Sequence, residues 1–193
     1  FFKVHSLDEI QNKRNNILYG FEKLEEISEK DEPTFTFAHF MMPHGPQAFD
    51  ENGDIPIQSK NESEKYFGEL LYANKKIKHL VDHILANSEI PPIILIQGDH
   101  GFPTMKSSRP DAEKIIKRYS ILSAYYLPGQ GKDKLYETIT PVNSFRLIFD
   151  HYFGTQFGLL EDKSYLPITY TEERKFIPLP NEDSLSNNGI SAL

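Results

Sequence analysis

Residues 91–101 read PPIILIQGDHG, an apolar run that ends in an acid, an imidazole and a glycine. Two prolines separate this run from what precedes it, and four branched aliphatic residues follow without a break. The pattern is typical of a strand that is buried on both faces inside a parallel sheet. We expect this strand, Ile93–Gln97, to be central to the fold. Its carboxyl end, with Asp99 and His100, lies where open α/β sheets bind ligands.

Asp99 and His100 have the chemistry of metal ligands. A carboxylate beside a neutral imidazole suits Zn, Mn or Fe better than Ca, and Gly101 allows the backbone to turn sharply so that both side chains face one point. Neighbouring residues on a regular strand point to opposite faces, so the strand has to end before Asp99. In the alternative interpretation Asp99 caps a following helix and His100 is an ordinary loop histidine. The pair alone leaves both interpretations open.

Helical and extended patterns alternate along the whole chain. This order predicts an α/β protein with a mostly parallel sheet, helices on both faces and an edge hairpin near the end. A helix over residues 61–87 is expected to be the crossover between two parallel strands. The predicted elements are a helix at 6–30 with Ser6 and Glu9 as a capping box, a strand at 34–42, a helix at 61–87, a strand at 93–97, a helix at 111–118, a strand at 119–127, a helix opened by Thr140 and Pro141, and extended pieces between 159 and 180.

Composition narrows the classes of partner. The 193 residues carry a formal net charge of -7 and no basic tract, which argues against a nucleic-acid partner. With no cysteine, neither a disulfide framework nor a thiolate metal site is possible. No apolar run approaches the roughly 20 residues of a membrane span, so we expect no membrane contact by this segment itself. We expect one domain over residues 1–180, with its amino-terminal part missing, and a loosely held tail over 181–193.

Histidines mark a second place of interest. His39 lies inside the predicted strand 34–42, and His44 follows it in the turn Pro-His-Gly-Pro. His79 and His83 are one helical turn apart, a spacing that can chelate a metal. They sit among charged residues, however, and a solvated helix face explains them better. We therefore retain His39 and His44 as candidates and set the other pair aside.

The ordered set of motifs resembles the carboxyl-terminal part of the alkaline phosphatase and sulfatase superfamily. A strand leading to HFMMPHGP (39–46), a long helix and an apolar strand leading to GDHG (98–101) carry this resemblance. It looks closest to the sulfatase-like branch that includes phosphoethanolamine transferases and lipoteichoic acid synthases. The later runs YSILSAYYLPG (119–129) and ITPVNSFRLIF (139–149) resemble sulfatase-like proteins of membrane-anchored type. The resemblance covers residues 34–166 and implies the carboxyl-terminal portion of an alkaline phosphatase-like fold.

The resemblance implies a role for each candidate residue. Asp99 and His100 match metal ligands, with Zn, Mn, Mg or Ca as the divalent metal. His44 matches a histidine that contacts the transferred group or a second metal, and His39 is a further substrate-binding candidate. In this family a Thr, Ser or formylglycine attacks phosphorus or sulfur. The sequence shows no such nucleophile, since Thr34 and Thr36 precede a strand instead of following one.

Two cations complete the candidate set. Lys106 and Arg109, in the loop after the Asp-His-Gly element, are candidates for contacting the anionic group of a phosphate or sulfate ester. Ordinary loop cations are an equally good interpretation of both. Relatives place another histidine shortly after Asp-His-Gly, whereas here the next is His151 inside a helix, which counts against a complete two-metal site.

Three functional hypotheses remain open. The first is part of a metal-dependent hydrolase or transferase that acts on phosphate or sulfate esters. The second is a non-catalytic binding or structural module derived from the same fold. The third is a small-ligand-binding domain of flavodoxin type, since any parallel sheet places polar residues at strand ends. Because the chain begins Phe-Phe-Lys, we expect it to be a segment of a longer chain. The family resemblance implies that this parent chain is membrane-anchored and acts on the extracytoplasmic side.

Overall fold

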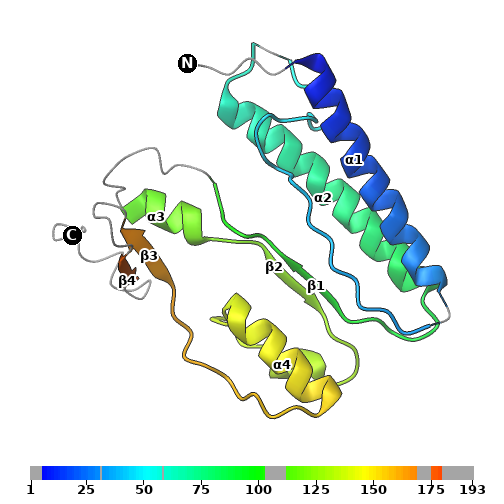
Figure 1. The fold of residues 1–193 in the computed structure, drawn as a ribbon, viewed down its shortest axis with the longest axis vertical. Helices are drawn as coiled ribbons and strands as arrows, with labels where there is room; N and C mark the ends of the chain where they lie inside the picture. The colour runs from blue at the N-terminus through cyan, green and yellow to red at the C-terminus, as the bar shows by residue number, and fades with distance from the viewer. Residues whose placement is uncertain (1–5, 31, 58, 103–111, 169–174, 180–193) are drawn as a thin grey trace. The chain divides into compact units, whose positions relative to one another are not determined.

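A computed structural model of the chain describes residues 6–30, 32–57, 59–102, 112–168 and 175–179 (Figure 1). The chain divides into two compact units, residues 1–92 and 93–193. Each unit has its own hydrophobic core and is described by itself.

The first unit is a pair of helices with a long connecting segment. Helix α1 spans Leu7–Glu25 and continues into the 3₁₀ helix η1, Glu26–Glu29, while α2 spans Glu62–Asn87. The predicted capping box of α1 is confirmed, because Ser6 Oγ accepts from the Glu9 amide and the Glu9 carboxylate accepts from the Ser6 amide. Helix α2 begins with the same device, built from Asn61 and Glu64. Local sequence therefore sets both helix starts.

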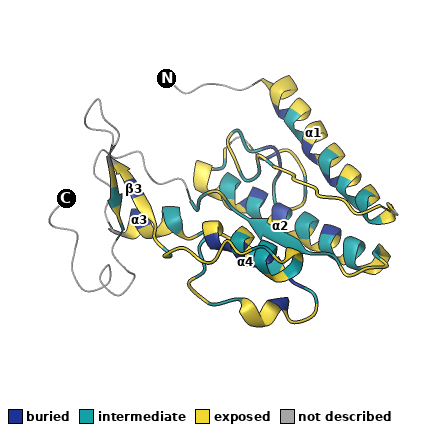
Figure 2. Ribbon diagram, turned by 60° about the horizontal axis from the view of Figure 1, so that its bottom comes forward, coloured by how far each residue is buried: buried dark blue, intermediate teal, exposed yellow. Residues whose placement is uncertain are grey.

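The core of the first unit lies between the helices and the connecting segment. One face of α1 is buried, and the loop around Ala48 and Phe49 is buried with it. The Phe21 ring stacks on Phe40 with centroids 4.4 Å apart. Figure 2 shows the buried positions of both helices in dark blue. At about 1.5–3 kcal/mol for each fully buried large apolar side chain, this cluster supplies much of the driving force for folding the unit. Its buried members are Ile10, Ile17, Phe21, Ala48, Phe49 and Leu80.

The predicted strand Thr34–Met42 is wrong, since this described segment carries no β-strand. Some of its apolar residues are packed in the core and others are exposed. Phe40 and Met42 pack against the helical core, whereas Phe35 and Phe37 are each 80% exposed. A strand needs a partner to take up its amides and carbonyls. In the described structure this segment gains its burial from helices, which offer no such ladder.

Helix α2 buries only part of the face that its periodicity suggests, with Leu80 buried and Ile77 and Ile84 packed against the core. Phe67 and Leu71 are each 54% exposed, whereas the carboxylate side chain of Glu69 is fully buried. Nor does α2 lie between two parallel strands, as expected of a crossover helix. The buried face of α2 includes the small residues Gly68 and Ala73, which the sequence analysis did not expect there. Small side chains on this face allow the connecting segment to approach closely.

The second unit combines a two-stranded sheet, helices and a hairpin. All of the predicted helices and strands after residue 92 are present with shifted ends. They are β1 (Ile94–Gln97), α3 (Ala112–Tyr119), β2 (Ser123–Tyr126), α4 (Pro141–Phe153), β3 (Tyr165–Ile168) and β4 (Lys175–Pro178). The 3₁₀ helix η2 (Gly131–Lys134) was not predicted. Strands β3 and β4 pair antiparallel, as expected of a hairpin, but they form a separate two-stranded sheet and not the edge of a larger one.

The predicted parallel sheet is not found in the described structure. Strands β1 and β2 pair antiparallel, with Ile94 opposite Tyr126 and Gln97 opposite Ser123. The reason is the return path of the chain: the Gly101 amide donates to the Arg118 carbonyl (2.7 Å), so the end of α3 lies beside the end of β1. The chain then enters β2 where β1 has just finished. With one partner strand, β1 is half-buried along its whole length and not buried on both faces.

Helix α4 supplies the core for this sheet. Leu147 and Ile148 are buried with Leu127, and Leu95 of β1 packs against them. Pro141 opens the helix as predicted, and its end at Gly154 has a left-handed φ of 67°.

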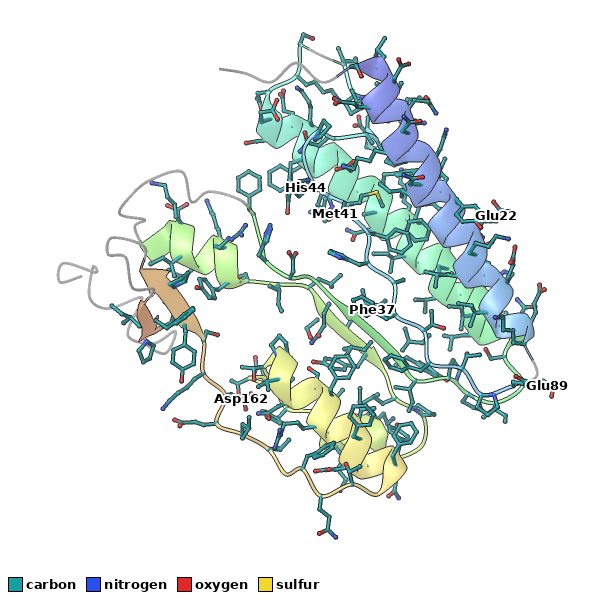
Figure 3. All side chains as sticks on the ribbon, in the orientation of Figure 1. Glu22, Phe37, Met41, His44, Glu89 and Asp162 are labelled. Atoms are coloured by element: carbon teal, nitrogen blue, oxygen red, sulfur yellow. The ribbon has the colours of Figure 1, made fainter. Side chains whose placement is uncertain are left out.

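The predicted cap of α4 works differently from a standard one. Thr140 is at the N-cap, but its hydroxyl donates to Asp162 (2.5 Å) and makes no side-chain bond to the helix. The Thr140 amide (2.7 Å), the Tyr136 hydroxyl (2.6 Å) and the Asn143 amide group (2.9 Å) also donate to this carboxylate. Figure 3 labels Asp162. This carboxylate joins the segment after α4 to the start of α4.

No described helix combines the length and the apolar character that crossing a membrane requires. The predicted boundary at residue 180 stays a prediction, because residues 180–193 lie outside the described structure.

Changing Asp162 to Asn tests the cap of α4. Burial alone would raise the pKa of this carboxyl, but the bonds from Thr140, Tyr136 and Asn143 outweigh it and hold the pKa below the ordinary value of 3.8. A lowered folded-state pKa means stability that is present above the unfolded-state pKa and lost as pH falls through the folded-state pKa. We expect Asp162→Asn to lower the free energy of unfolding at pH 7 by about 1–3 kcal/mol.

Urea denaturation at pH 7 and at several values below pH 4 would measure both effects. The Asn variant should lose less stability than the wild type on acidification. Asp133→Asn, on the exposed surface of η2, is the matched control at pH 7 and should leave stability within about 0.5 kcal/mol. Equal acid dependence of the wild type and Asp162→Asn would contradict this account.

Candidate functional site

Asp99 and His100 follow β1 directly after Gly98. The strand ends at Gln97, as the metal-ligand hypothesis requires, because residues beyond a strand end can point to the same side. The His100 Nε2 atom lies 3.8 Å from Asp99 Oδ2. The Asp99 side chain is 78% exposed and that of His100 29% exposed. A carboxylate oxygen and an imidazole nitrogen therefore lie close together at an accessible point.

The hydrogen bond of His100 selects which ring nitrogen is available. Its Nδ1 atom lies 2.7 Å from the Gly101 carbonyl oxygen. A carbonyl oxygen only accepts, so Nδ1 carries the proton and, in the neutral ring, Nε2 keeps its lone pair. This is the orientation that a metal-ligating histidine needs, with one nitrogen held by a backbone carbonyl and the other facing the ion.

Gly101 fixes the turn through close approach and not through a left-handed backbone. A Cβ atom at this position would overlap the Lys117 carbonyl oxygen and lie 2.5 Å from the Ser120 carbonyl oxygen. Only glycine lets the chain pass this close to the end of α3. The close contact holds the segment that carries Asp99 and His100.

His44 lies in the first unit, in the loop that follows the extended segment (Figure 3). The peptide bonds before Pro43 and Pro46 are both cis. The His44 amide donates to Glu69 Oε2 (3.0 Å), and its carbonyl accepts from Lys13 Nζ (2.5 Å). The histidine itself is exposed. Its backbone is thus held from both sides while its side chain faces outward.

Glu69 and Lys13 hold this loop, and the sequence analysis did not identify either residue. Burial raises the pKa of Glu69, while Lys13 and the backbone amides act in the opposite direction. Burial likewise lowers the pKa of Lys13, against the effect of Glu69. On a helix that carries many charges, nothing distinguishes Glu69 from its neighbours.

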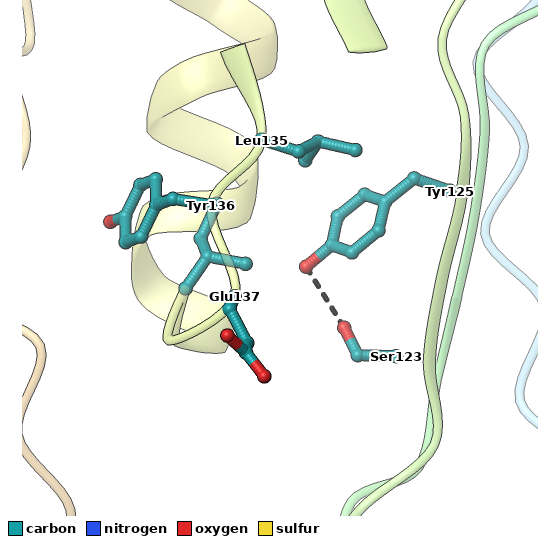
Figure 4. Close-up of a pocket in the computed structure, with 6 residues that line it drawn as sticks. Ser123, Tyr125, Leu135, Tyr136 and Glu137 are labelled. Carbon is teal, nitrogen blue, oxygen red and sulfur yellow. Dashed lines mark hydrogen bonds between the residues drawn. The ribbon is translucent and has the colours of Figure 1, made fainter. Parts of the chain in front are cut away.

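The second unit also has a polar network beside the sheet. Gln97 Nε2 donates to Ser144 Oγ (3.0 Å), which lies 2.7 Å from the Tyr125 hydroxyl, and Ser123 Oγ donates to the same hydroxyl (2.9 Å). Ser123 and Tyr125 line an open pocket of about 360 Å³ (Figure 4). The hydroxyl groups satisfy one another, so this network orders the sheet against α4.

The remaining candidates are less well supported. His39 is exposed on the extended segment. Lys106 and Arg109 lie outside the described residues. His79, which the sequence assigns to a solvated face, is 65% exposed and lies 3.5 Å from a Glu25 carboxylate oxygen.

Within the described ranges, no group of three or more acidic or histidine side chains is arranged to hold a metal ion. Asp99 and His100 fit two positions of such a site by donor type and orientation. Because His44 and the Asp99-His100 pair each follow a predicted strand, we expect them to converge at one edge of a parallel sheet. This stays a prediction, because His44 belongs to the other compact unit.

Comparison with known proteins establishes the family. The family model for sulfatases matches residues 15–146, more than half of the chain. The match includes the segment with His44 and the Asp99-His100 pair. Neither the curated proteins nor the solved structures gave a match. The chain belongs to the sulfatase family, which acts on sulfate esters and includes hydrolases and transferases.

Replacing Gly101 with Ala tests whether the close contact holds the Asp99-His100 segment. The added methyl group has to push apart two backbone segments, which typically costs about 1–3 kcal/mol in a packed structure. We expect lower stability in urea denaturation and a changed chemical shift of the His100 ring in NMR spectra.

Gly98→Ala is the matched control, three residues earlier. A Cβ there would lie 3.7 Å from its nearest neighbours, an ordinary contact. Its stability should stay within about 0.5 kcal/mol of the wild type. Equal behaviour of the two variants would show that the Gly101 contact does not fix the segment.

Proposed function

We propose that this chain is part of a metal-dependent hydrolase or transferase that acts on phosphate or sulfate esters. The observation that carries the proposal is the geometry after β1. Asp99 Oδ2 and His100 Nε2 lie 3.8 Å apart, with Nδ1 held by a backbone carbonyl. This arrangement offers one hard oxygen and one nitrogen ligand to a divalent ion. Membership of the sulfatase family supports the ester class.

The proposal gives each residue a separate task. Asp99 and His100 would hold a divalent ion, which supplies charge stabilisation and orients the ester when bound. His44 would contact the transferred group, and His39, Lys106 and Arg109 would contact the substrate. The metal is one of Zn, Mn, Mg and Ca. The nucleophile belongs to a part of the protein that these residues do not supply.

A finer assignment follows the resemblance. Within the family we favour the branch of phosphoethanolamine transferases and lipoteichoic acid synthases, with a membrane-anchored parent chain that acts on the extracytoplasmic side. The motifs that favour it are HFMMPHGP and GDHG. The alternative is a non-catalytic module derived from the same fold. The lack of a third ligand among the described residues favours that alternative.

The decisive experiment uses the longest natural chain that contains these residues. It would be assayed with p-nitrophenyl sulfate, p-nitrophenyl phosphate and bis-p-nitrophenyl phosphate, with Zn, Mn, Mg or Ca supplied. We expect metal-dependent turnover that falls by more than about 100-fold in Asp99→Ala and His100→Ala, because residues that bind the ion matter at least as much as the residues that orient them. Bound metal, measured by mass spectrometry of the purified protein, should fall in the same variants.

His79→Ala is the matched histidine control and should leave turnover and metal content unchanged. Residues 1–193 alone should bind the ion weakly and show no turnover, because no covalent intermediate forms without a nucleophile. A natural chain that binds no metal and hydrolyses none of the esters would support the non-catalytic module. Turnover by residues 1–193 alone, lost in Asp99→Ala, would show that the nucleophile lies within them.

A further inference from the structure

The loop that carries His44 is held by a buried carboxylate. Glu69 is fully buried on α2, and each of its oxygens accepts one backbone amide of the loop. The His44 amide donates to Oε2 (3.0 Å) and the Ala48 amide to Oε1 (2.7 Å). An ionised carboxylate can accept both bonds at once, because all its lone pairs are acceptors. Glu69 therefore links the backbone of the loop at residues 44 and 48.

Lys13 on α1 holds the opposite polar groups of the same loop. Its ammonium donates to the His44 carbonyl (2.5 Å) and the Pro46 carbonyl (2.9 Å) and lies 3.7 Å from Glu69 Oε1. Arg14, the next residue, donates to the Ala48 carbonyl (2.6 Å) and stacks over the Phe49 ring at 4.4 Å. Glu69 thus accepts from amides of the loop, and Lys13 and Arg14 donate to its carbonyls. Lys13 also compensates the charge of Glu69, as a buried carboxylate requires.

These contacts share one property that matters for function. Every contact that Glu69 and Lys13 make to residue 44 goes to its backbone. The backbone of residue 44 is therefore held at its amide and at its carbonyl, while its exposed imidazole takes no part in these contacts.

We propose that Glu69 is the positioning residue for His44, with Lys13 as its counterpart on the carbonyl side. Together they hold the backbone of residue 44 in one conformation, so that its imidazole is presented to the transferred group of the ester. This inference rests on the proposed function, in which His44 contacts that group. Glu69 itself touches no substrate, and its effect on turnover passes through His44.

The first measurement is independent of catalysis. In the longest natural chain, hydrogen exchange of the His44 and Ala48 amides is compared between the wild type and Glu69→Gln. The amide side chain offers one acceptor oxygen where two are needed, so protection of at least one of these amides should fall by about tenfold or more. Glu62→Gln, an exposed carboxylate on the first turn of α2, is the matched control and should leave both amides protected. Unchanged protection in Glu69→Gln would overturn the inference.

The second measurement asks whether Glu69 acts through His44. Glu69→Gln should lower kcat about 10–100-fold with KM within about twofold, the scale of losing a residue that orients a catalytic group. His44→Ala should lower kcat at least as much. The double variant should then be no worse than His44→Ala alone, since a positioning residue has nothing left to position. Additive losses would leave Glu69 a purely structural residue and overturn the inference.

The outcomes separate this inference from the proposed function. If His44→Ala leaves turnover unchanged, the role of His44 in the proposed function fails, and the role of Glu69 fails with it. If His44→Ala lowers turnover and Glu69→Gln does not, only the inference fails. Should Glu69→Gln not fold, Lys13→Met replaces it, since it keeps the aliphatic stem and removes the ammonium that holds the carbonyl side.

Discussion

A carboxylate removed from water has to find donors, and in the first unit Glu69 finds them in the loop that it packs against. Leaving such a charge without partners costs several kcal/mol, so α1, α2 and the loop depend on one another. Helix α2 brings the anion, α1 brings Lys13 and Arg14, and the loop brings the amides of His44 and Ala48. The same elements also share the apolar cluster that includes Ile17, Phe21 and Phe49.

In the second unit the segment with the candidate residues is held without a buried charge. The Asp99-His100 segment is held by a backbone contact, in which Gly101 passes against the carbonyls that end α3 and its amide donates to Arg118. Side chains that bind ions have to stay accessible, so they cannot serve as anchors themselves. In both units a rigid backbone carries the candidate side chain, and the residues that hold it lie elsewhere. This is the division of labour expected of functional loops on a stable scaffold.

The antiparallel pairing of β1 and β2 changes how the candidate site is understood. In a parallel sheet the carboxyl ends of the strands lie at one edge. The sequence analysis placed Asp99 and His100 at such an edge. In the observed unit, the end of β1 meets the start of β2, and Ser123 faces Gln97 across the pair. The polar network of Gln97, Ser144 and Tyr125 is a consequence of that pairing. Family membership rests on the match of the sulfatase family model to residues 15–146, and the strand direction does not alter it.

The amino-acid sequence by itself determined the features that depend on neighbours within a few residues. The Ser6–Glu9 box, Pro141 at the start of α4, and the Asp99-His100-Gly101 turn after an apolar run are of this kind, and each is found where expected. Tertiary structure alone decided the features that depend on distant partners. Glu69 bonds to amides 21 and 25 residues away, and β2 pairs antiparallel with β1 beside a bond from the Gly98 amide to the distant Leu122 carbonyl. A charged residue on a helix and an apolar run look the same in sequence whether or not such partners exist, because burial and pairing are properties of the packed chain.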